Sequence, residues 1–325
     1  MPVVFSSSYR APWWLPGGHA QTIFPTVFRR VPDLPFERTY LDLSDGDCIG
    51  LDWVYAKKKS RAVLLLSHGL EGDSRRKYIR GMCLAALELG MDCVARNFRC
   101  CGGTTNRLPG MYHSGQTLDI RDTVTFCLAQ GYESVFLVGY SMGGNQTLKY
   151  LGEEGKAIAP QVRAAAVFSV PCDLPGAAKV LDLPKNSIYM RNFMRTLKEK
   201  VRRKHAAYPG LYPLDALDAM RTFAEFDAAY TAPVHGFLSA EDYWTKASSL
   251  PWLTKITVPT LVVNARNDPF LSSGCYPTAL AKASAGVFLE MPEQGGHVGF
   301  TLARSGPYWS ERRAIEFFRP YLPSA

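Results

Sequence analysis

A serine between two glycines stands where a buried strand is expected to turn into a helix. Residues 139–143, GYSMG, have the spacing G-x-S-x-G and overlap the end of the apolar run SVFLVGY. Such a tight turn needs glycines on both sides of its central residue, and it lifts that side chain above the sheet. The pattern therefore predicts that Ser141 is a nucleophile. The alternative is a glycine-rich turn that carries an incidental serine.

A serine hydroxyl is a weak nucleophile and needs a base, usually a histidine that a carboxylate orients. His297 lies in the glycine-rich segment EQGGHVGF, after a predicted strand at 287–292. This place agrees with the chain order serine, acid, histidine that accompanies a nucleophile at a strand-to-helix turn. We therefore expect His297 to be the base. Chain order disfavours four other histidines, which precede the serine or lie in a predicted insertion: His19, His113, His205 and His235.

The acid of such a triad is expected on a loop that follows a strand between the serine and the histidine. Asp268, in the segment NARNDPF, directly follows a predicted strand at 259–266, and Pro269 favours a sharp turn after it. We therefore expect Asp268 to orient the histidine; the alternative is a carboxylate that only caps the turn. Three other aspartates lie in or beside the insertion and are weaker candidates: Asp173, Asp227 and Asp242.

Backbone N–H groups near the serine are expected to stabilise the oxyanion that forms during acyl transfer. Met142, the residue after the nucleophile, supplies the first donor. The loop after a predicted strand at 62–68, in the segment SHGLEG, supplies the second. We assign it to the Leu70 N–H, because Gly69 lets the backbone approach closely. His68 belongs to this loop and has a different role from the base.

The elements that must position these residues alternate between strand and helix, which predicts an α/β fold with a mostly parallel central sheet flanked by helices. The strands are expected at 38–43, 48–55, 62–68, 91–98, 134–140, 164–170, 259–266 and 287–292. The helices are expected at 78–89, within 100–130, and at 142–152, 276–284 and 309–319.

Residues 171–255 break this alternation, because they are helical, basic and aromatic and contain no buried strand run. We therefore expect a single domain over residues 1–325, with a helical cap insertion at about 171–255 and an N-terminal arm at 1–37. Trp13 and Trp14 lie in that arm. Because two adjacent tryptophans in water would be costly, we expect the arm to pack on the core.

The charge of the chain is concentrated in one segment. The 325 residues carry a net charge of +8, and segment 191–205 alone holds seven Lys or Arg and one Glu. No nucleic-acid motif accompanies this segment, so we expect no nucleic-acid partner. We expect a solvated helix face instead; the alternative is attraction to anionic lipid surfaces or acidic esters.

Several classes of protein are excluded by what the sequence lacks. With 47% hydrophobic and 20% charged residues the chain is not disordered, and no apolar stretch is long enough to span a membrane. The start lacks a signal peptide and the eight cysteines form no CxxC, so we expect free thiols in the cytoplasm. Motifs for metals, nucleotides and other cofactors are also lacking, so we expect none.

These segments together resemble the YheT-like family of α/β-hydrolases, which includes plant EMB8-like proteins and yeast medium-chain ester synthases. The resemblance covers nearly the whole chain. It implies an α/β-hydrolase fold and a serine hydrolase of carboxylic esters, with the triad on Ser141, Asp268 and His297. The segments that carry it are PWWLPGGHAQTIFP, HGLEGDS, NFRCCGGTTNR with YHSG, GYSMGGN, NARNDPF and GGHVGF.

The chain departs from this family in two respects. Cys100 and Cys101 stand where a glycine or another small residue is expected, and the membrane anchor common in animal members is not found. We expect a serine esterase that cleaves short- to medium-chain acyl esters, small or lipid-like, through an acyl-enzyme. An alcohol acyltransferase and a non-catalytic binding protein are the alternatives. His113 either contacts the substrate or satisfies polar groups of the loop around it.

Overall fold

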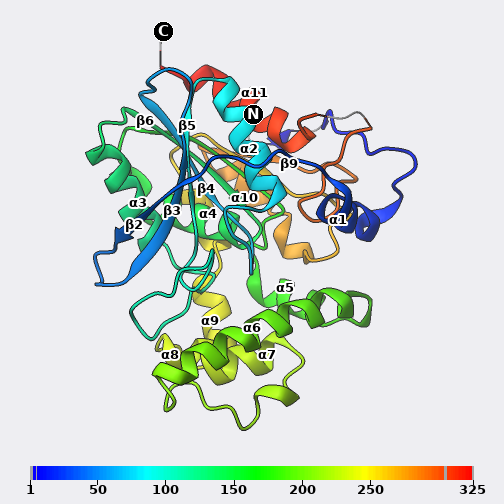
Figure 1. Ribbon diagram of the computed structural model, residues 1–325. Helices are drawn as coiled ribbons and strands as arrows, with labels where there is room; N and C mark the ends of the chain where they lie inside the picture. The colour runs from blue at the N-terminus through cyan, green and yellow to red at the C-terminus, as the bar shows by residue number, and fades with distance from the viewer. Residues whose placement is uncertain (1–2, 5, 304–305, 324–325) are drawn as a thin grey trace.

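Within the residues that the computed structural model describes (3–4, 6–303 and 306–323), nine strands form one sheet in the order β1-β9-β8-β7-β6-β4-β5-β3-β2 (Figure 1). Strand β3 runs antiparallel to its neighbours β2 and β5, and all the other neighbouring strands are parallel. The strands are β1 Val3–Val4, β2 Glu37–Asp42, β3 Cys48–Val54, β4 Ala62–Ser67, β5 Asp92–Arg96, β6 Ser134–Tyr140, β7 Val162–Phe168, β8 Thr260–Val263 and β9 Val287–Glu290.

Helices cover both faces of the sheet, so β4 and β6 have no exposed residue and their sequences are continuous apolar runs. One apolar core joins the sheet to α2 and α11, and the other joins it to α3, α4 and α10. No helix of the described chain is long and apolar enough to cross a bilayer. The helices are α1 Gly17–Phe28, α2 Lys77–Glu88, α3 Leu118–Ala129, α4 Met142–Glu154, α5 Leu174–Leu181, α6 Ser187–Ala207, α7 Phe223–Phe226, α8 Ala232–Val234, α9 Ala240–Ala247, α10 Thr278–Ala283 and α11 Trp309–Phe318.

The predicted mostly parallel sheet is confirmed, with differences of a few residues where strands end. The strand expected at 164–170 ends at Phe168, because Ser169 adopts a φ of 54° and turns the chain out of the sheet. The strand expected at 259–266 ends at Val263. Beyond it, the Asn264 side chain accepts from the Val170 N–H and donates to the Val170 carbonyl. These side-chain bonds take the place of backbone hydrogen bonds between the two strands. Both strands therefore end before the predicted bounds, at the residues where the chain leaves the sheet.

Between β7 and β8 the chain forms a group of helices, α5 to α9, which we call the insertion helices and which lie together below the sheet in Figure 1. The longest, α6, has 21 residues and contains the whole basic segment 191–205. Its buried residues Met190, Met194, Leu197 and Val201 recur every three or four positions, as in an amphipathic helix. They form an apolar core within the insertion, separate from the two cores on the sheet.

The N-terminal arm packs on the rest of the molecule, but the reason given for this, the cost of leaving its two tryptophans in water, is wrong. Trp13 is 91% exposed and Trp14 is 41% exposed. The arm is attached by other means: β1 pairs with β9, Tyr9 is buried, and α1 lies against the body of the molecule. Helix α1 was not predicted, because its buried face is largely polar and gives little hydrophobic periodicity.

Candidate active site

Ser141 lies in the strained turn between β6 and α4. Its φ of 52° and ψ of −120° are rare for a residue with a side chain, and its N–H donates to the Phe168 carbonyl at 2.9 Å. The two flanking glycines are required by space. A Cβ at Gly143 would lie 2.4 Å from the His68 carbonyl oxygen, and one at Gly139 would lie 2.6 Å from the Gly143 carbonyl oxygen. The glycines therefore permit the turn that presents the hydroxyl.

The structure brings together the three residues that the sequence singled out. The Ser141 Oγ lies 2.9 Å from His297 Nε2, and His297 Nδ1 lies 2.9 and 3.1 Å from the two carboxylate oxygens of Asp268. Because Asp268 can only accept from Nδ1–H, Nε2 is left as the acceptor for the serine hydroxyl. The three side chains thus form one continuous chain of hydrogen bonds.

Asp268 is only 6% exposed and is fixed in the turn after β8. One of its oxygens also accepts the Phe270 N–H at 2.9 Å, and the Phe270 ring packs on the His297 imidazole with centroids 4.1 Å apart. The competing aspartates lie elsewhere. Asp173 caps α5 and Asp242 pairs with Lys246, whereas Asp227 lines the cavity described below.

Helix α1 holds the histidine and aspartate loops, a role that the sequence analysis missed. Thr22 Oγ accepts the His297 N–H at 2.8 Å. Gln21 Oε1 accepts from Asn267 Nδ2 at 3.0 Å and from the Gly295 N–H at 2.8 Å, and Gln21 is fully buried. Both residues lie in the segment GGHAQT, but a helix whose buried face is polar has no hydrophobic period by which the sequence could reveal it.

The loop after β4 lies against the serine. A Cβ on Gly69 would lie 3.2 Å from the Ser141 Cβ. The buried His68 accepts the Phe98 N–H at Nε2, so its Nδ1 carries the proton and donates to the Gly69 carbonyl at 2.7 Å. Burial lowers the pKa of His68 well below its ordinary value, which keeps the ring neutral. The Gly69 C=O and the Leu70 N–H belong to the same trans peptide group, so they point in opposite directions. Because the Gly69 carbonyl faces the His68 ring, the Leu70 N–H points away from that ring.

A buried ion pair connects this loop to the insertion helices. Glu71, which has a φ of 56°, accepts from Lys200 Nζ of α6 at 2.5 Å and from the Tyr112 hydroxyl. Lys200 Nζ also lies 3.0 Å from Cys101 Sγ and 4.7 Å from the centroid of the Tyr112 ring. The side chains of Glu71 and Lys200 are 6% and 12% exposed. Part of the basic segment therefore faces inward.

A mainly apolar cavity of about 910 Å³, counted with the open space at its mouth, lies between the sheet and the insertion helices. Ser141, His297, Met142 and Leu70 line it on the sheet side, and side chains of the insertion helices form the opposite wall. In the described part of the chain, no group of three or more His, Cys, Asp or Glu is placed to hold a metal ion. The cavity is thus an apolar space that ends on the serine.

His113 lines this cavity and also holds its own loop. Its Nδ1 accepts the Gly115 N–H at 3.2 Å, and its carbonyl accepts from Gln146 Nε2 at 2.8 Å. Its ring packs on His235, with centroids 4.6 Å apart. Burial, helped by repulsion from His235, lowers the pKa of His113 well below its ordinary value. Of the two roles that the sequence left open for His113, the structure therefore shows that it satisfies polar groups of the loop around it.

Comparison with known proteins identifies the family. A profile described as "alpha/beta hydrolase fold" matches residues 62–303. The chain is also 35% identical to "Putative esterase YheT" of Escherichia coli K12, over 94% of this chain and 91% of that protein. The chain belongs to the YheT-like family of α/β-hydrolases. "Phospholipase ABHD3" of Homo sapiens is 31% identical over 92% of this chain and 75% of that protein. The Pyrococcus furiosus esterase Pf2001 shares the fold, with a TM-score of 0.59, 14% identity and coverage of 90% of this chain and 98% of that one.

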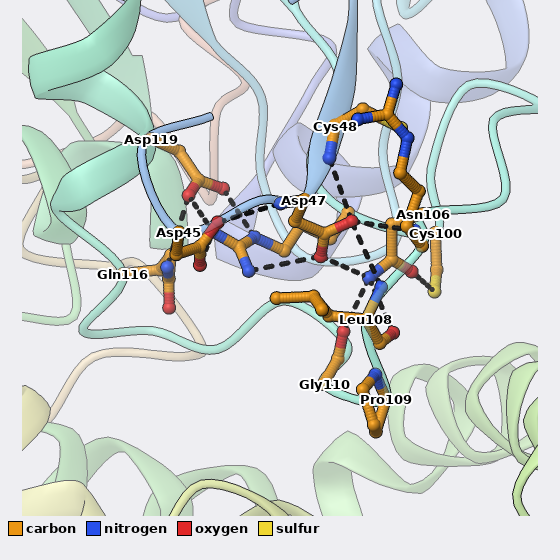
Figure 2. Close-up of polar contacts among 12 residues, drawn as sticks. Asp45, Asp47, Cys48, Cys100, Asn106, Leu108, Pro109, Gly110, Gln116 and Asp119 are labelled. Atoms are coloured by element: carbon orange, nitrogen blue, oxygen red, sulfur yellow. Dashed lines mark hydrogen bonds and ion pairs between the residues drawn. The ribbon is translucent and has the colours of Figure 1, made fainter. Parts of the chain in front are cut away.

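In this YheT-like hydrolase, a buried ionic network fixes the loop between β5 and α3 that forms one cavity wall. Figure 2 shows three carboxylates around one guanidinium, which belongs to Arg99 and lies 2.7 Å from Asp119, 2.8 Å from Asp45 and 3.1 Å from Asp47. Asp47 is fully buried. Burial alone would raise its pKa, but hydrogen bonds from Asn106 and from three backbone N–H groups outweigh this and lower it.

The same loop explains one departure of this YheT-like chain from its family. Cys100 adopts a φ of 62°, in the region that favours glycine, which accounts for the expectation of a glycine or small residue there. Its Sγ lies 2.8 Å from Asn106 Oδ1, and burial raises the pKa of the thiol. All eight cysteines lie in the described part of the chain and are free.

Proposed function

We propose that this protein is a serine esterase in which Ser141, His297 and Asp268 form the catalytic triad. The observation that carries the proposal is the continuous chain of hydrogen bonds from the Asp268 carboxylate to the Ser141 hydroxyl, which opens into an apolar cavity. A strained serine that faces a cavity and contacts an imidazole nitrogen has the geometry of an activated nucleophile.

In the first step, Ser141 Oγ attacks the ester carbonyl while His297 Nε2 takes the hydroxyl proton. The oxyanion of the tetrahedral intermediate accepts hydrogen bonds from the N–H groups of Met142 and Leu70. His297 then protonates the leaving alcohol, and the acyl group stays on Ser141. Asp268 holds the imidazole in the required tautomer and stabilises its charged form.

In the second step, His297 removes a proton from a water molecule, which attacks the acyl-enzyme and releases the carboxylic acid. Serine is then protonated again by His297. An alcohol in place of water would transfer the acyl group instead. Because the triad does not discriminate between them, product analysis in water with added ethanol measures how the acyl-enzyme divides between hydrolysis and transfer.

The apolar lining of the cavity supports esters with short- to medium-chain acyl groups. Its wall is formed by apolar side chains of the insertion helices, such as Leu174, Leu181, Phe193 and Leu197. We propose that these helices act as a cap over the acyl chain, within a single domain that includes the N-terminal arm. The names of the relatives, an esterase and a phospholipase, agree with an ester substrate of this kind.

The proposal is tested with p-nitrophenyl esters whose acyl chains run from two to twelve carbons. We expect hydrolysis with a maximum of kcat/KM at short to medium length, and a loss of at least about 10⁴-fold in Ser141→Ala. Ser134, a buried serine at the start of β6, gives the matched control Ser134→Ala, which should stay active. Absence of turnover of every ester by folded wild-type protein would leave a non-catalytic binding protein as the explanation.

A further inference from the structure

A carboxylate lies in the wall of the apolar cavity and is not used by the mechanism above. Asp227 begins a π-helical turn, Asp227–Thr231, that follows α7, and its side chain is 9% exposed. It accepts from Thr231 Oγ at 2.6 Å and from the Trp244 indole N–H at 2.8 Å. Asp227, Thr231 and Trp244 all line the cavity that contains Ser141. Together they form a polar patch in the part of the wall contributed by the insertion helices.

In the described part of the chain, the Asp227 carboxylate forms no ion pair. Among residues 3–4, 6–303 and 306–323, no Lys, Arg or His nitrogen lies within ion-pair distance of it, although other buried aspartates such as Asp47 and Asp119 have one. Two hydrogen bonds use only part of the acceptor capacity of a carboxylate, which has about four lone-pair sites. Burial raises the pKa of Asp227 to about 6, so the group is still mainly ionised at pH 8.

The structure around Asp227 does not require its charge. A neutral asparagine could accept from the Trp244 indole through its oxygen and donate to the Thr231 hydroxyl through its nitrogen. It would satisfy the same two partners without placing an ion in an apolar wall, where an unpaired charge destabilises the fold. A charged group kept under these conditions is typical of a binding site, where the missing partner comes with the ligand.

We propose that Asp227 binds a hydrogen-bond donor, a hydroxyl or an ammonium group, on the part of the ester substrate that occupies the cavity. This inference rests on the proposed esterase function and makes the substrate class narrower: an ester whose chain carries a polar donor beyond an apolar stretch. Aromatic side chains that line the same cavity, Phe226, Tyr243 and Trp244, would contact the stem of such a group and would also favour a cation.

The test compares p-nitrophenyl esters of equal chain length that end in methyl, hydroxyl, ammonium or trimethylammonium, with six- and eight-carbon acyl chains. The measured quantity is kcat/KM for each polar ester divided by kcat/KM for the methyl ester. A charge-assisted hydrogen bond predicts that this ratio falls about 10- to 100-fold in Asp227→Asn for the hydroxyl or ammonium ester. The matched control Asp242→Asn, at a surface aspartate of α9, should leave the ratio unchanged.

Two results would overturn the inference. A ratio near one in the wild type that does not change in Asp227→Asn shows that nothing in the substrate meets the carboxylate. A preference for trimethylammonium as large as that for ammonium shows that the site recognises positive charge only, without a hydrogen bond donated to Asp227. Failure of the esterase proposal is distinct, because then the methyl ester is not hydrolysed either.

Unfolding measurements separate this role from a structural one. If Asp227 binds substrate, Asp227→Asn should be at least as stable as the wild type in urea at pH 8, because a desolvated charge has been removed. If the fold instead needs the charge of Asp227 for its bonds with Thr231 and Trp244, the variant should lose stability and the substrate ratio should stay constant. The wild-type ratio remains decisive even if the variant does not fold.

Discussion

At the scale of single residues, the site depends on three side chains that stand at turns leaving the carboxyl ends of parallel strands. Ser141 follows β6, Asp268 follows β8 and His297 follows β9. Parallel strands bring such turns to one edge of the sheet, where side chains far apart in sequence meet. Their sequence spacing made all three recognisable, because each lies in a short glycine-, asparagine- or proline-containing segment after an apolar run.

The carboxylate of the triad can be tested by an isosteric change. Asp268→Asn keeps the size of the side chain but can donate to His297 Nδ1, which favours the tautomer that cannot accept from Ser141. We expect kcat on a p-nitrophenyl ester to fall by about 10⁴ while the fold is retained. Circular dichroism and steady-state kinetics measure both, with the exposed Asp215→Asn as the control. A loss of less than tenfold would contradict the proposed role.

The buried Asp47 predicts a pH dependence of stability. Its folded pKa lies below the unfolded value of about 3.9, so it stabilises the fold above that pH and the contribution is lost as pH falls through the folded pKa. Asp47→Asn should therefore reduce the free energy of unfolding by about 2–4 kcal/mol at pH 7, and by less below pH 4. Urea unfolding between pH 3 and 7 measures the difference.

The control for this experiment is Asp42→Asn, which removes an ion pair with Arg107 whose side chains are 76% and 56% exposed. Exposed pairs contribute little, so this variant should unfold as the wild type does at every pH. A difference between Asp47→Asn and wild type that stays constant from pH 3 to 7 would show that the carboxylate charge is not the stabilising feature.

At the scale of elements, buried strands could be predicted from sequence and α1 could not. A strand covered on both faces has a continuous apolar run, so β4 and β6 were placed at or within one residue of their ends. Helix α1 acts through Gln21 and Thr22, whose partners lie more than 240 positions away in the chain. Contacts of this range leave no local pattern, and the same is true of the pair between Glu71 and Lys200.

The ion pair between α6 and the loop after β4 should affect catalysis through the position of the Leu70 N–H. Lys200→Met removes the partner of the buried Glu71, which would leave that carboxylate with the Tyr112 hydroxyl. We expect kcat to fall about tenfold with little change in KM, since a displaced oxyanion donor weakens binding of the transition state alone. Stopped assays over a range of substrate concentrations measure the two constants separately.

The matched variant is Lys198→Met, which removes another lysine of α6, two residues earlier, whose Nζ donates to the Asp218 carbonyl at the surface. Its kinetic constants should equal those of the wild type. If Lys200→Met lowers stability but leaves kcat unchanged, the pair is structural and does not position the loop.

At the scale of the whole molecule, the net charge of +8 has a more specific origin than composition indicates. Most of the excess lies on α6, but Lys200 and Lys204 face inward, and Arg195 and Arg202 pair with Glu199 and Asp218. Overall charge could be read from the sequence, whereas the direction of each side chain depended on how α6 packs. The positive charge of α6 that is available to attract ligands at long range is therefore smaller than the composition of segment 191–205 indicates.

The outer face of α6 predicts a salt-dependent preference for anionic substrates. Replacing Arg195, Arg202 and Arg203 by Gln should lower kcat/KM for an anionic ester about threefold at about 0.01 M salt, and should leave a neutral ester unchanged. The difference should vanish near 0.15 M salt, where charges are screened over about 8 Å. If the substituted protein has the same kcat/KM as the wild type for both esters at all salt concentrations, this face has no role in attraction.

Whether Ser141 is the nucleophile is measured most directly by intact mass after reaction with a fluorophosphonate, which bonds covalently to an activated serine. We expect one adduct per chain, located on Ser141 by peptide mapping, which is absent in Ser141→Ala and forms much more slowly in His297→Ala. Folded wild-type protein that gains no adduct, or Ser141→Ala that is labelled as fast as the wild type, would show that Ser141 is not the nucleophile.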